Sequence, residues 1–304
     1  MHDTQHITVL LHEAVDALDI QSSDVIVDAT LGAAGHSSLI AERLGKGGTL
    51  IALDADEKAV ARAREKFIHV APNVRFWNAN FRELAPLLEQ IGYDKVDGIL
   101  ADLGWRQEQF GGSAEEGGGK GFSFRMDEPL HMTYGDPATY PFTAYDIANE
   151  WEADSIATIL RGYSEEKYAW KIAQAIVAAR EVGVIETSGQ LAKIIEDAVP
   201  ASYRHGGIHS ATRTFQAMRI AVNDELGALE AFIDGAIKHL APQGRLAIIT
   251  FHSLEDRIVK HAFRKAAADG LGDIVTKRPL MSSDEEVVAN PRARSAKLRV
   301  LEKT

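Results

Sequence analysis

The stretch VIVDATLGAAGHS, residues 25–37, decides how the chain folds. It begins as an apolar run typical of a buried strand, stops at an acid, and passes through small residues into a helical pattern. Glycine after a first strand allows a tight turn and the close approach of a ligand, and the following helix start offers free backbone N–H groups. Only G-x-x-G is present, without the full G-x-G-x-x-G, so a plain tight turn stays an open alternative.

The patterns around this stretch predict a mostly parallel α/β sheet, because strand and helix patterns alternate over the first hundred residues. The strands expected there are VIVDA (25–29), TLIALDAD (49–56), NVRFWNA (73–79) and VDGILADLG (96–104). A fifth apolar strand, GRLAIITFHS (244–253), comes late in the chain. We expect GDIVTK (272–277) and SAKLRVLE (295–302) to close the sheet as an antiparallel pair.

A helical segment interrupts this pattern. GGSAEEGGGKG (111–121) is too rich in glycine for regular structure, and the periodicity from about residue 143 to 199 is helical. We therefore expect three parts: the first part of a sheet-containing core over 1–110, a glycine-rich loop with a helical insert over 111–210, and the second part of the core over 211–304.

Composition limits the classes of function. No apolar run in the 304 residues approaches the ~20 of a membrane span, and the start MHDTQHITVLLHE has no secretory signal pattern. We therefore expect a cytoplasmic protein with no membrane partner. The chain has no cysteine, which excludes disulfides, a thiolate zinc site and a cysteine adduct for methylation at carbon 5 of a pyrimidine. We assign no residue to a metal, and the sequence leaves a homodimer open.

The net charge of −11 means that a nucleic-acid partner would have to meet a local basic patch. The segment NPRARSAKLRV offers one, with Arg292, Arg294 and Lys297. Arg213 is a further candidate for contact with phosphate. A solvated charged face is the alternative for each of them.

Acids end two further strands. Asp54 follows Gly32 by 22 residues, the spacing at which an acid accepts the hydroxyls of an adenosine ribose. Asp102 ends the fourth strand, where ligands of open α/β sheets bind. Phe81 follows the third strand and is either an adenine-stacking residue or part of the core. These features indicate a nucleoside-containing cofactor but do not separate NAD from S-adenosylmethionine; the terminal antiparallel pair is more typical of methyltransferases.

Several long motifs, in order, resemble the MraW family of ribosomal RNA methyltransferases over nearly the whole chain. The resemblance implies the class I S-adenosylmethionine-dependent methyltransferase fold, Rossmann-like, with a helical substrate-recognition insert. It also implies methylation of a cytidine N4 in 16S ribosomal RNA, near the decoding centre of the small ribosomal subunit. The motifs are HITVLLHEAVDAL, VDATLGAAGHS, ALDAD, ADLG, GFSFRMDEPL, RTFQAMRIAVNDEL, GRLAIITFHSLEDR and NPRARSAKLRV.

The resemblance also implies a set of cofactor contacts. The methionine end would lie against the turn, mainly its backbone, and the ribose and adenine farther along the sheet edge. The residues at the matching positions are Ala34, Gly35, His36, Asp54, Phe81, Asp102 and Gln109.

The chain departs from the family pattern at several positions, most of them where substrate would enter. The family usually has glycine at Ala34, a Val-Ser-Ser run at Trp105–Gln107, aspartate at His131, an Arg-Met pair at Thr133–Tyr134 and proline at Ser210. These departures therefore concern the recognition of the RNA more than the binding of the cofactor.

An exocyclic amine needs alignment with the methyl group and an acceptor for its developing positive charge. Asp102 is the first candidate for this acceptor, with Asn223, Asp224 and His252 as runners-up. For Asn223 and Asp224 the alternative is helix capping and packing. His252 could orient substrate; the alternative is that Ser253 simply caps the next helix.

Other functions fit parts of the sequence. An NAD-dependent oxidoreductase shares the strand, glycine and acid pattern and predicts nicotinamide binding. A non-catalytic ribosome-assembly protein that retains the cofactor fold predicts binding without turnover. A DNA or small-molecule methyltransferase is an alternative within the class.

Overall fold

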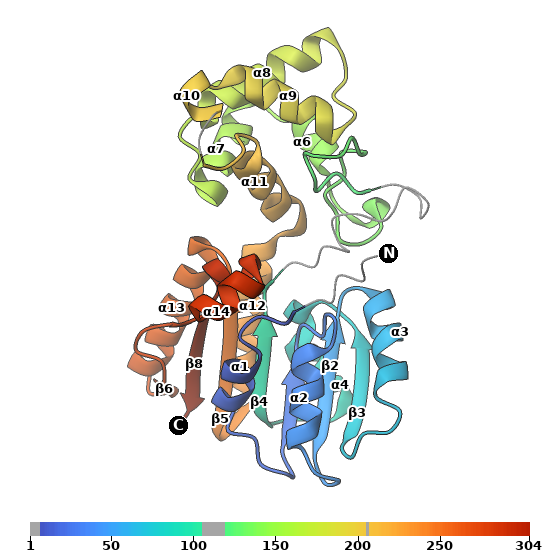
Figure 1. The fold of residues 1–304 in the computed structure, drawn as a ribbon, viewed down its shortest axis with the longest axis vertical. Helices are drawn as coiled ribbons and strands as arrows, with labels where there is room; N and C mark the ends of the chain where they lie inside the picture. Colours follow the sequence, from blue (N-terminus) through green and yellow to red (C-terminus); the bar gives the residue numbers. More distant parts are fainter. Residues whose placement is uncertain (1–6, 105–118, 205–206) are drawn as a thin grey trace. The chain divides into compact units, whose positions relative to one another are not determined.

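The computed structural model describes residues 7–104, 119–204 and 207–304. The chain divides into two compact units, one of Met1–Gly104 with Leu226–Thr304 and one of Trp105–Glu225. The first unit holds the sheet and the second is helical (Figure 1).

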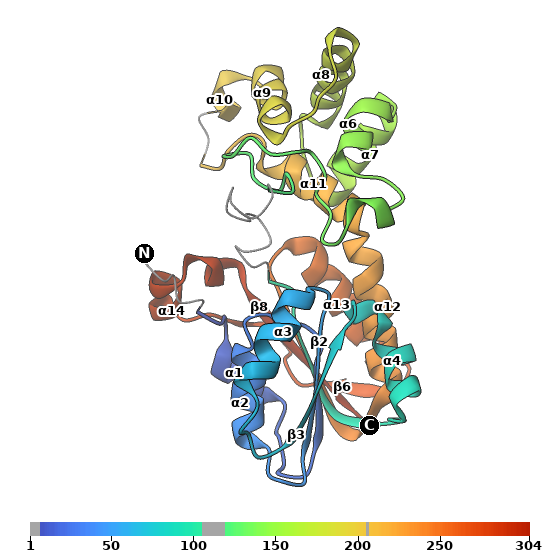
Figure 2. The same cartoon turned by 90° about the vertical axis from the view of Figure 1, so that its right-hand side faces the viewer.

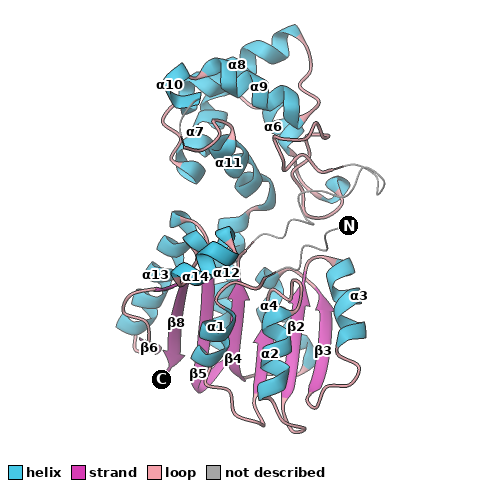
Figure 3. Ribbon diagram, viewed as in Figure 1, coloured by secondary structure: helices cyan, strands magenta, loops and turns pink. Residues whose placement is uncertain are grey.

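The first unit is built on an eight-stranded sheet in the order β3-β2-β1-β4-β5-β8-β6, with β7 paired to β8 (Figure 3). The strands β1 to β5 are mutually parallel, and β8 pairs antiparallel with β5, β6 and β7. Their bounds are β1 Val25–Asp28, β2 Thr49–Asp54, β3 Asn73–Asn78, β4 Val96–Asp102, β5 Leu240–Thr250, β6 Gly272–Ile274, β7 Leu280–Met281 and β8 Lys297–Lys303. The mostly parallel sheet with C-terminal antiparallel strands confirms the predicted fold.

Helices cover both faces of this sheet, with α1, α2 and α3 on one face and α4, α12 and α13 on the other (Figure 2). Alternate strand residues serve the two faces: Leu50 packs in the cluster with Ile40, and Ile51 packs in the cluster with Phe232. The helices are α1 Leu11–Ala17, α2 Gly35–Arg43, α3 Glu57–Lys66, η1 Phe81–Glu83, α4 Leu84–Ile91, α12 Glu225–His239, α13 Ser253–Ala268, α14 Asp284–Ala289 and η4 Pro291–Ser295.

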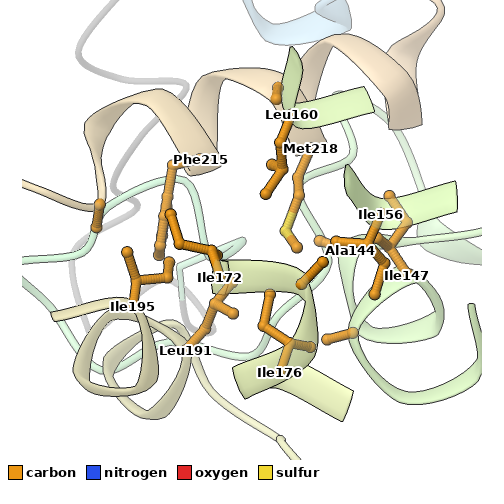
Figure 4. Packing of buried hydrophobic residues seen from close by; sticks show 14 of the residues in the cluster. Ala144, Ile147, Ile156, Leu160, Ile172, Ile176, Leu191, Ile195, Phe215 and Met218 are labelled. Carbon is orange, nitrogen blue, oxygen red and sulfur yellow. The ribbon is translucent and has the colours of Figure 1, made fainter. Parts of the chain in front are cut away.

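The second unit packs its helices around an apolar core of its own (Figure 4). Phe215 and Met218 of α11 lie in this core, so the unit continues to Glu225, beyond the boundary at 210 expected from the sequence. Its helices are η3 Pro137–Thr139, α6 Ala144–Glu150, α7 Ala153–Ser164, α8 Ala169–Val182, α9 Ser188–Ala198, α10 Ala201–Arg204 and α11 Thr212–Asn223. Within the described ranges, no helix combines the length and apolar character needed to cross a membrane.

Candidate functional site

Three strands of the first unit end in aspartates. Asp28 ends β1, Asp54 ends β2 and Asp102 ends β4. Because these strands are parallel neighbours, their carboxyl ends meet at one edge of the sheet, which is where ligands of such sheets bind. The candidate site is therefore this edge, together with the turn between β1 and α2.

Asp54 fixes the turn that the sequence singled out. Gly32 has a positive φ of 58°, and its N–H donates to Asp54 Oδ2 at 2.8 Å. The other oxygen, Oδ1, accepts the N–H of Asp56 at 2.8 Å. A carboxylate offers about four acceptor positions, so holding the turn is compatible with accepting ligand hydroxyls as well.

The two residues before His36 are small for local reasons. Ala34 has a φ of 63°, a left-handed conformation that disfavours bulky side chains and favours glycine. A Cβ on Gly35 would lie 1.8 Å from Thr8 Oγ1, so the N-terminal segment occupies the space that the missing side chain leaves. Glycine at position 35 therefore makes room for the Thr8 side chain, and its small size is not explained by a ligand alone.

The His36 ring makes contacts of its own, and its expected backbone contact with the cofactor stays a prediction. The ring is buried, with Nε2 3.1 Å from the Val9 carbonyl and Nδ1 3.8 Å from Asp102 Oδ2. Burial lowers the pKa of His36, although the nearby Asp28 opposes this shift. The imidazole is therefore held neutral near neutral pH, and its Nε2–H donates to Val9.

Asp28 is a site residue that the sequence analysis did not assign. It is buried, and it accepts the Ser37 hydroxyl at 2.6 Å and the Thr30 N–H at 3.1 Å. Burial raises the pKa of Asp28, while His36 and the two hydrogen bonds lower it by less. The available signal was its place at the end of the first strand, which is the same signal that identified Asp54 and Asp102.

Asp102 is held from two sides. Its N–H donates to Thr30 Oγ1 at 2.6 Å, and its Oδ1 accepts the Gly104 N–H at 2.9 Å. A Cβ on Gly104 would lie 2.8 Å from both Asp102 Oδ1 and the ring of Phe251, so only glycine fits there. The carboxylate is therefore positioned by the backbone around it.

Phe81 lies in η1, beyond the end of β3, and is half-buried. Its ring meets Phe232 edge-on, with centroids 5.5 Å apart, so at least one edge of it belongs to the core. Gln109 lies outside the described residues.

His252 has a structural role as a helix cap. It is the N-cap of α13, where its Nδ1 accepts the Glu255 N–H at 3.4 Å and Glu255 in turn accepts the backbone N–H of His252 at 3.2 Å. The expectation that Ser253 caps this helix is wrong, because Ser253 is already its first residue.

Asn223 and Arg213 both belong to the second unit. The Asn223 side-chain N–H groups donate to the carbonyls of Met132 and Arg219, and its Oδ1 accepts the Tyr134 N–H at 3.1 Å. One donor and the Oδ1 acceptor thus hold the chain around residues 132–134, and the other donor bonds within α11, which favours packing over chemistry. Arg213 lies 3.4 Å from the Tyr203 hydroxyl.

The predicted basic segment is partly neutralised. Lys297 and Arg299 both bind Asp256, at 3.3 and 2.7 Å. Burial alone would raise the pKa of Asp256, but these two cations hold it below its ordinary value. Arg294 is exposed, whereas Arg292 and Lys297 are both half-buried.

The charges at the sheet edge suit a ribose-containing cofactor with a positive group. Asp102 brings a carboxylate within 3.8 Å of His36, the second residue of α2. A dinucleotide would place its negative pyrophosphate at this helix start, where that carboxylate repels it. The sulfonium and ammonium of S-adenosylmethionine are attracted instead, so the residues present fit this cofactor.

Residues 3–304 match the model of the MraW methylase family. The chain belongs to this family. S-adenosylmethionine is accordingly its methyl donor, and the alternative of an NAD-dependent oxidoreductase is set aside.

Two relatives are similar to the chain over nearly their whole length. A Brevibacillus brevis protein named "Ribosomal RNA small subunit methyltransferase H" is 44% identical over 313 residues, covering 98% of each chain. A Paenibacillus protein of the same name is 45% identical over 320 residues, covering 98% of this chain and 99% of that one. Among solved structures, an rRNA methylase from Streptococcus thermophilus covers 98% of each chain with 11% identity and a TM-score of 0.45.

Proposed function

We propose that this methylase acts on ribosomal RNA of the small subunit, and that its target atom is the exocyclic N4 of a cytidine in 16S RNA near the decoding centre. The full-length similarity to relatives named as small-subunit methyltransferases carries the coarser part of this proposal. The finer part rests on the motif resemblance and on an absence of cysteine, which leaves no thiol for an adduct at the base.

The cofactor would be held by the turn and the strand ends of the first unit. We assign the backbone of Ala34, Gly35 and His36 to its methionine end, and Asp54 to its ribose. Phe81, half-buried against Phe232, would contact the adenine. Bound there, S-adenosylmethionine supplies an electrophilic methyl group on a positively charged sulfur.

Asp102 is the candidate catalytic residue. The lone pair of a cytidine N4 is delocalised into the ring, so the amine is a weak nucleophile. The amine gains positive charge when this lone pair forms the new bond to carbon, and it must then lose one N4 proton. A carboxylate that accepts an N–H hydrogen bond from this amine stabilises that charge and aligns the amine. The Gly104 N–H binds the Asp102 carboxylate, and Thr30 Oγ1 accepts the Asp102 backbone N–H, so both contacts anchor this residue at the sheet edge.

The target base must leave its stack or come from a single-stranded region, because an amine inside a duplex is out of reach. We assign phosphate contacts to Arg292 and Arg294 of η4, and further contacts to Lys297 and Arg213. We further propose a cytoplasmic location. A homodimer is also left to be tested.

The proposal is tested by incubating the protein with small ribosomal subunits that lack the modification and a deuterated methyl donor, then analysing the digested RNA by mass spectrometry. N4-methylcytidine with the deuterium label is the expected product. Label on another nucleoside would overturn the assignment of N4 as the target atom but would leave RNA methylation as the activity. Cofactor binding without labelled RNA would indicate an assembly protein without turnover, and label only on a DNA substrate would overturn the substrate class.

A further inference from the structure

We propose that Glu286 and Asn290 are positioning residues for the methyl donor, acting through an N-terminal strap. The strap is the segment Ile7–Leu10, which lies against the turn before α2. This inference rests on the proposed assignment of that turn to the cofactor.

The strap contacts the two residues at the start of α2. Thr8 Oγ1 fills the space beside Gly35 that a Cβ would need, and the Val9 carbonyl accepts the buried His36 ring at 3.1 Å. Val9 and Leu10 are themselves buried. A shift of the strap would therefore move His36 and leave open space beside Gly35.

Two side chains near the C-terminus hold the strap from its other side. Glu286 Oε1, on α14, accepts the Leu10 N–H at 2.7 Å. Asn290, which follows α14 and is buried, donates from Nδ2 to the Ile7 carbonyl at 3.0 Å. The first and last residues of the strap are thus both tied to a segment more than 270 residues away in sequence.

The strap does not hold this shape by its own preference. Leu10 has a φ of 50° and a ψ of 39°, the left-handed conformation that a leucine rarely adopts. Such a backbone persists only where the surroundings fix it, and such residues gather at functional sites. Glu286 binds the N–H of this same strained residue, so its loss is expected to release the strap.

The Asn290→Asp variant separates the contact of Asn290 with the strap from its role in capping η4. Asn290 Oδ1 accepts the Arg292 N–H at the start of η4, and an aspartate keeps that acceptor while losing the donor to Ile7. Ala289→Asp is the matched control, since it adds the same charge at an exposed neighbour.

Glu286→Ala removes the second strap contact, and Glu286→Gln is its rescue variant because the amide keeps an acceptor oxygen. Glu285→Ala removes the same charge from an exposed neighbour on the same helix and serves as control. The comparison therefore separates the hydrogen bond from the charge.

The experiment measures calorimetric binding of S-adenosylhomocysteine to the full-length protein, and kcat and KM for S-adenosylmethionine. Asn290→Asp and Glu286→Ala are expected to weaken binding about tenfold and to raise KM by the same factor, with kcat within about twofold. Glu286→Gln and both controls should stay within about threefold of the natural protein. Unchanged binding in folded Asn290→Asp and Glu286→Ala, or equal losses in the controls, would overturn the inference.

Hydrogen exchange of the natural protein provides a test that needs no variant. Binding of S-adenosylhomocysteine should slow exchange over residues 8–10 together with 34–38, and protection confined to 34–38 would overturn the inference. Asp54→Asn distinguishes the two proposals. If Asp54→Asn also binds normally, the cofactor site itself is misassigned; if it alone weakens binding, only the strap inference fails.

Discussion

Asp54 and Asp102 of the first unit differ from Glu225 of the second unit in what their carboxylates bind. In the first unit, Asp54 and Asp102 accept backbone N–H groups at the ends of parallel strands, at the edge where a cofactor fits. In the second unit, Glu225 accepts the Tyr134 hydroxyl at 2.5 Å and Arg219 through both oxygens, at 2.8 and 3.1 Å. A carboxylate bound to backbone N–H groups fixes the shape of a turn. A carboxylate bound to a largely buried guanidinium neutralises a positive charge that is desolvated when the chain folds.

The largest expected effect concerns this ion pair of the second unit. Glu225→Ala leaves Arg219, only 12% exposed, without its bidentate partner, which typically costs about 3–5 kcal/mol of folding free energy. Hydrogen-exchange mass spectrometry should show faster exchange over α11 and unchanged exchange over β1–β5. Equal acceleration in both units would contradict their separate packing.

Asp102→Asn tests chemistry in the first unit. The amide keeps an acceptor for the Gly104 N–H but loses the charge proposed to stabilise the reacting amine, so kcat should fall about 100-fold. Single-turnover methylation of small subunits measures this, with melting temperature as the check on folding. A kcat within about threefold of the natural protein would remove Asp102 from the chemistry.

Two buried groups of the first unit, His36 and Asp28, should make stability depend on pH. His36 has a pKa below its ordinary 6.5 in the folded protein, so the unfolded state binds more protons as the pH falls below 6.5, and stability is lost there. The loss is at most about 1.4 kcal/mol for each pH unit. Asp28 acts oppositely: its raised pKa makes the folded state gain stability as the pH falls toward 3.8, which offsets part of the loss.

Denaturant unfolding from pH 7.5 to 5.5 measures this effect, with His36→Gln as the comparison because its amide can still donate to the Val9 carbonyl. The variant should lose the pH dependence above pH 5.5. If its profile matches that of the natural protein, another group is responsible.

The smallest expected effect is at His252. Asparagine is a good N-cap, so His252→Asn should keep methylation within about twofold, while His252→Ala should cost about 1 kcal/mol of stability. Rate assays and melting curves on both variants separate the alternatives. A loss of activity in His252→Asn comparable to that in Asp102→Asn would make His252 a catalytic residue.

Local sequence predicted the features that depend on neighbours along the chain. Apolar runs located the strands of the sheet, and the acids that end β2 and β4 lie at the predicted edge. The two-residue β7 carries too short a pattern to detect. His252 and Ser253 are adjacent and both polar, so spacing alone did not separate cap from first helical residue.

Features that depend on distant residues could not be predicted. The partner of Lys297 is Asp256, and one donor of Asn223 binds the Met132 carbonyl, pairings that only the folded chain brings together. The close approach of Thr8 to Gly35 is likewise a tertiary contact. A glycine in a ligand-binding motif can therefore have a packing reason that its motif does not reveal.

The central claim is that the acids at the strand ends of the first unit hold the cofactor, whereas Glu225 stabilises the fold of the second unit. A matched pair of carboxylate substitutions tests this claim. The measurement is calorimetric binding of S-adenosylhomocysteine to Asp54→Asn and Glu225→Gln. The expected result is at least about tenfold weaker binding for Asp54→Asn, and unchanged binding with a lower melting temperature for Glu225→Gln. Normal binding by folded Asp54→Asn would contradict the account.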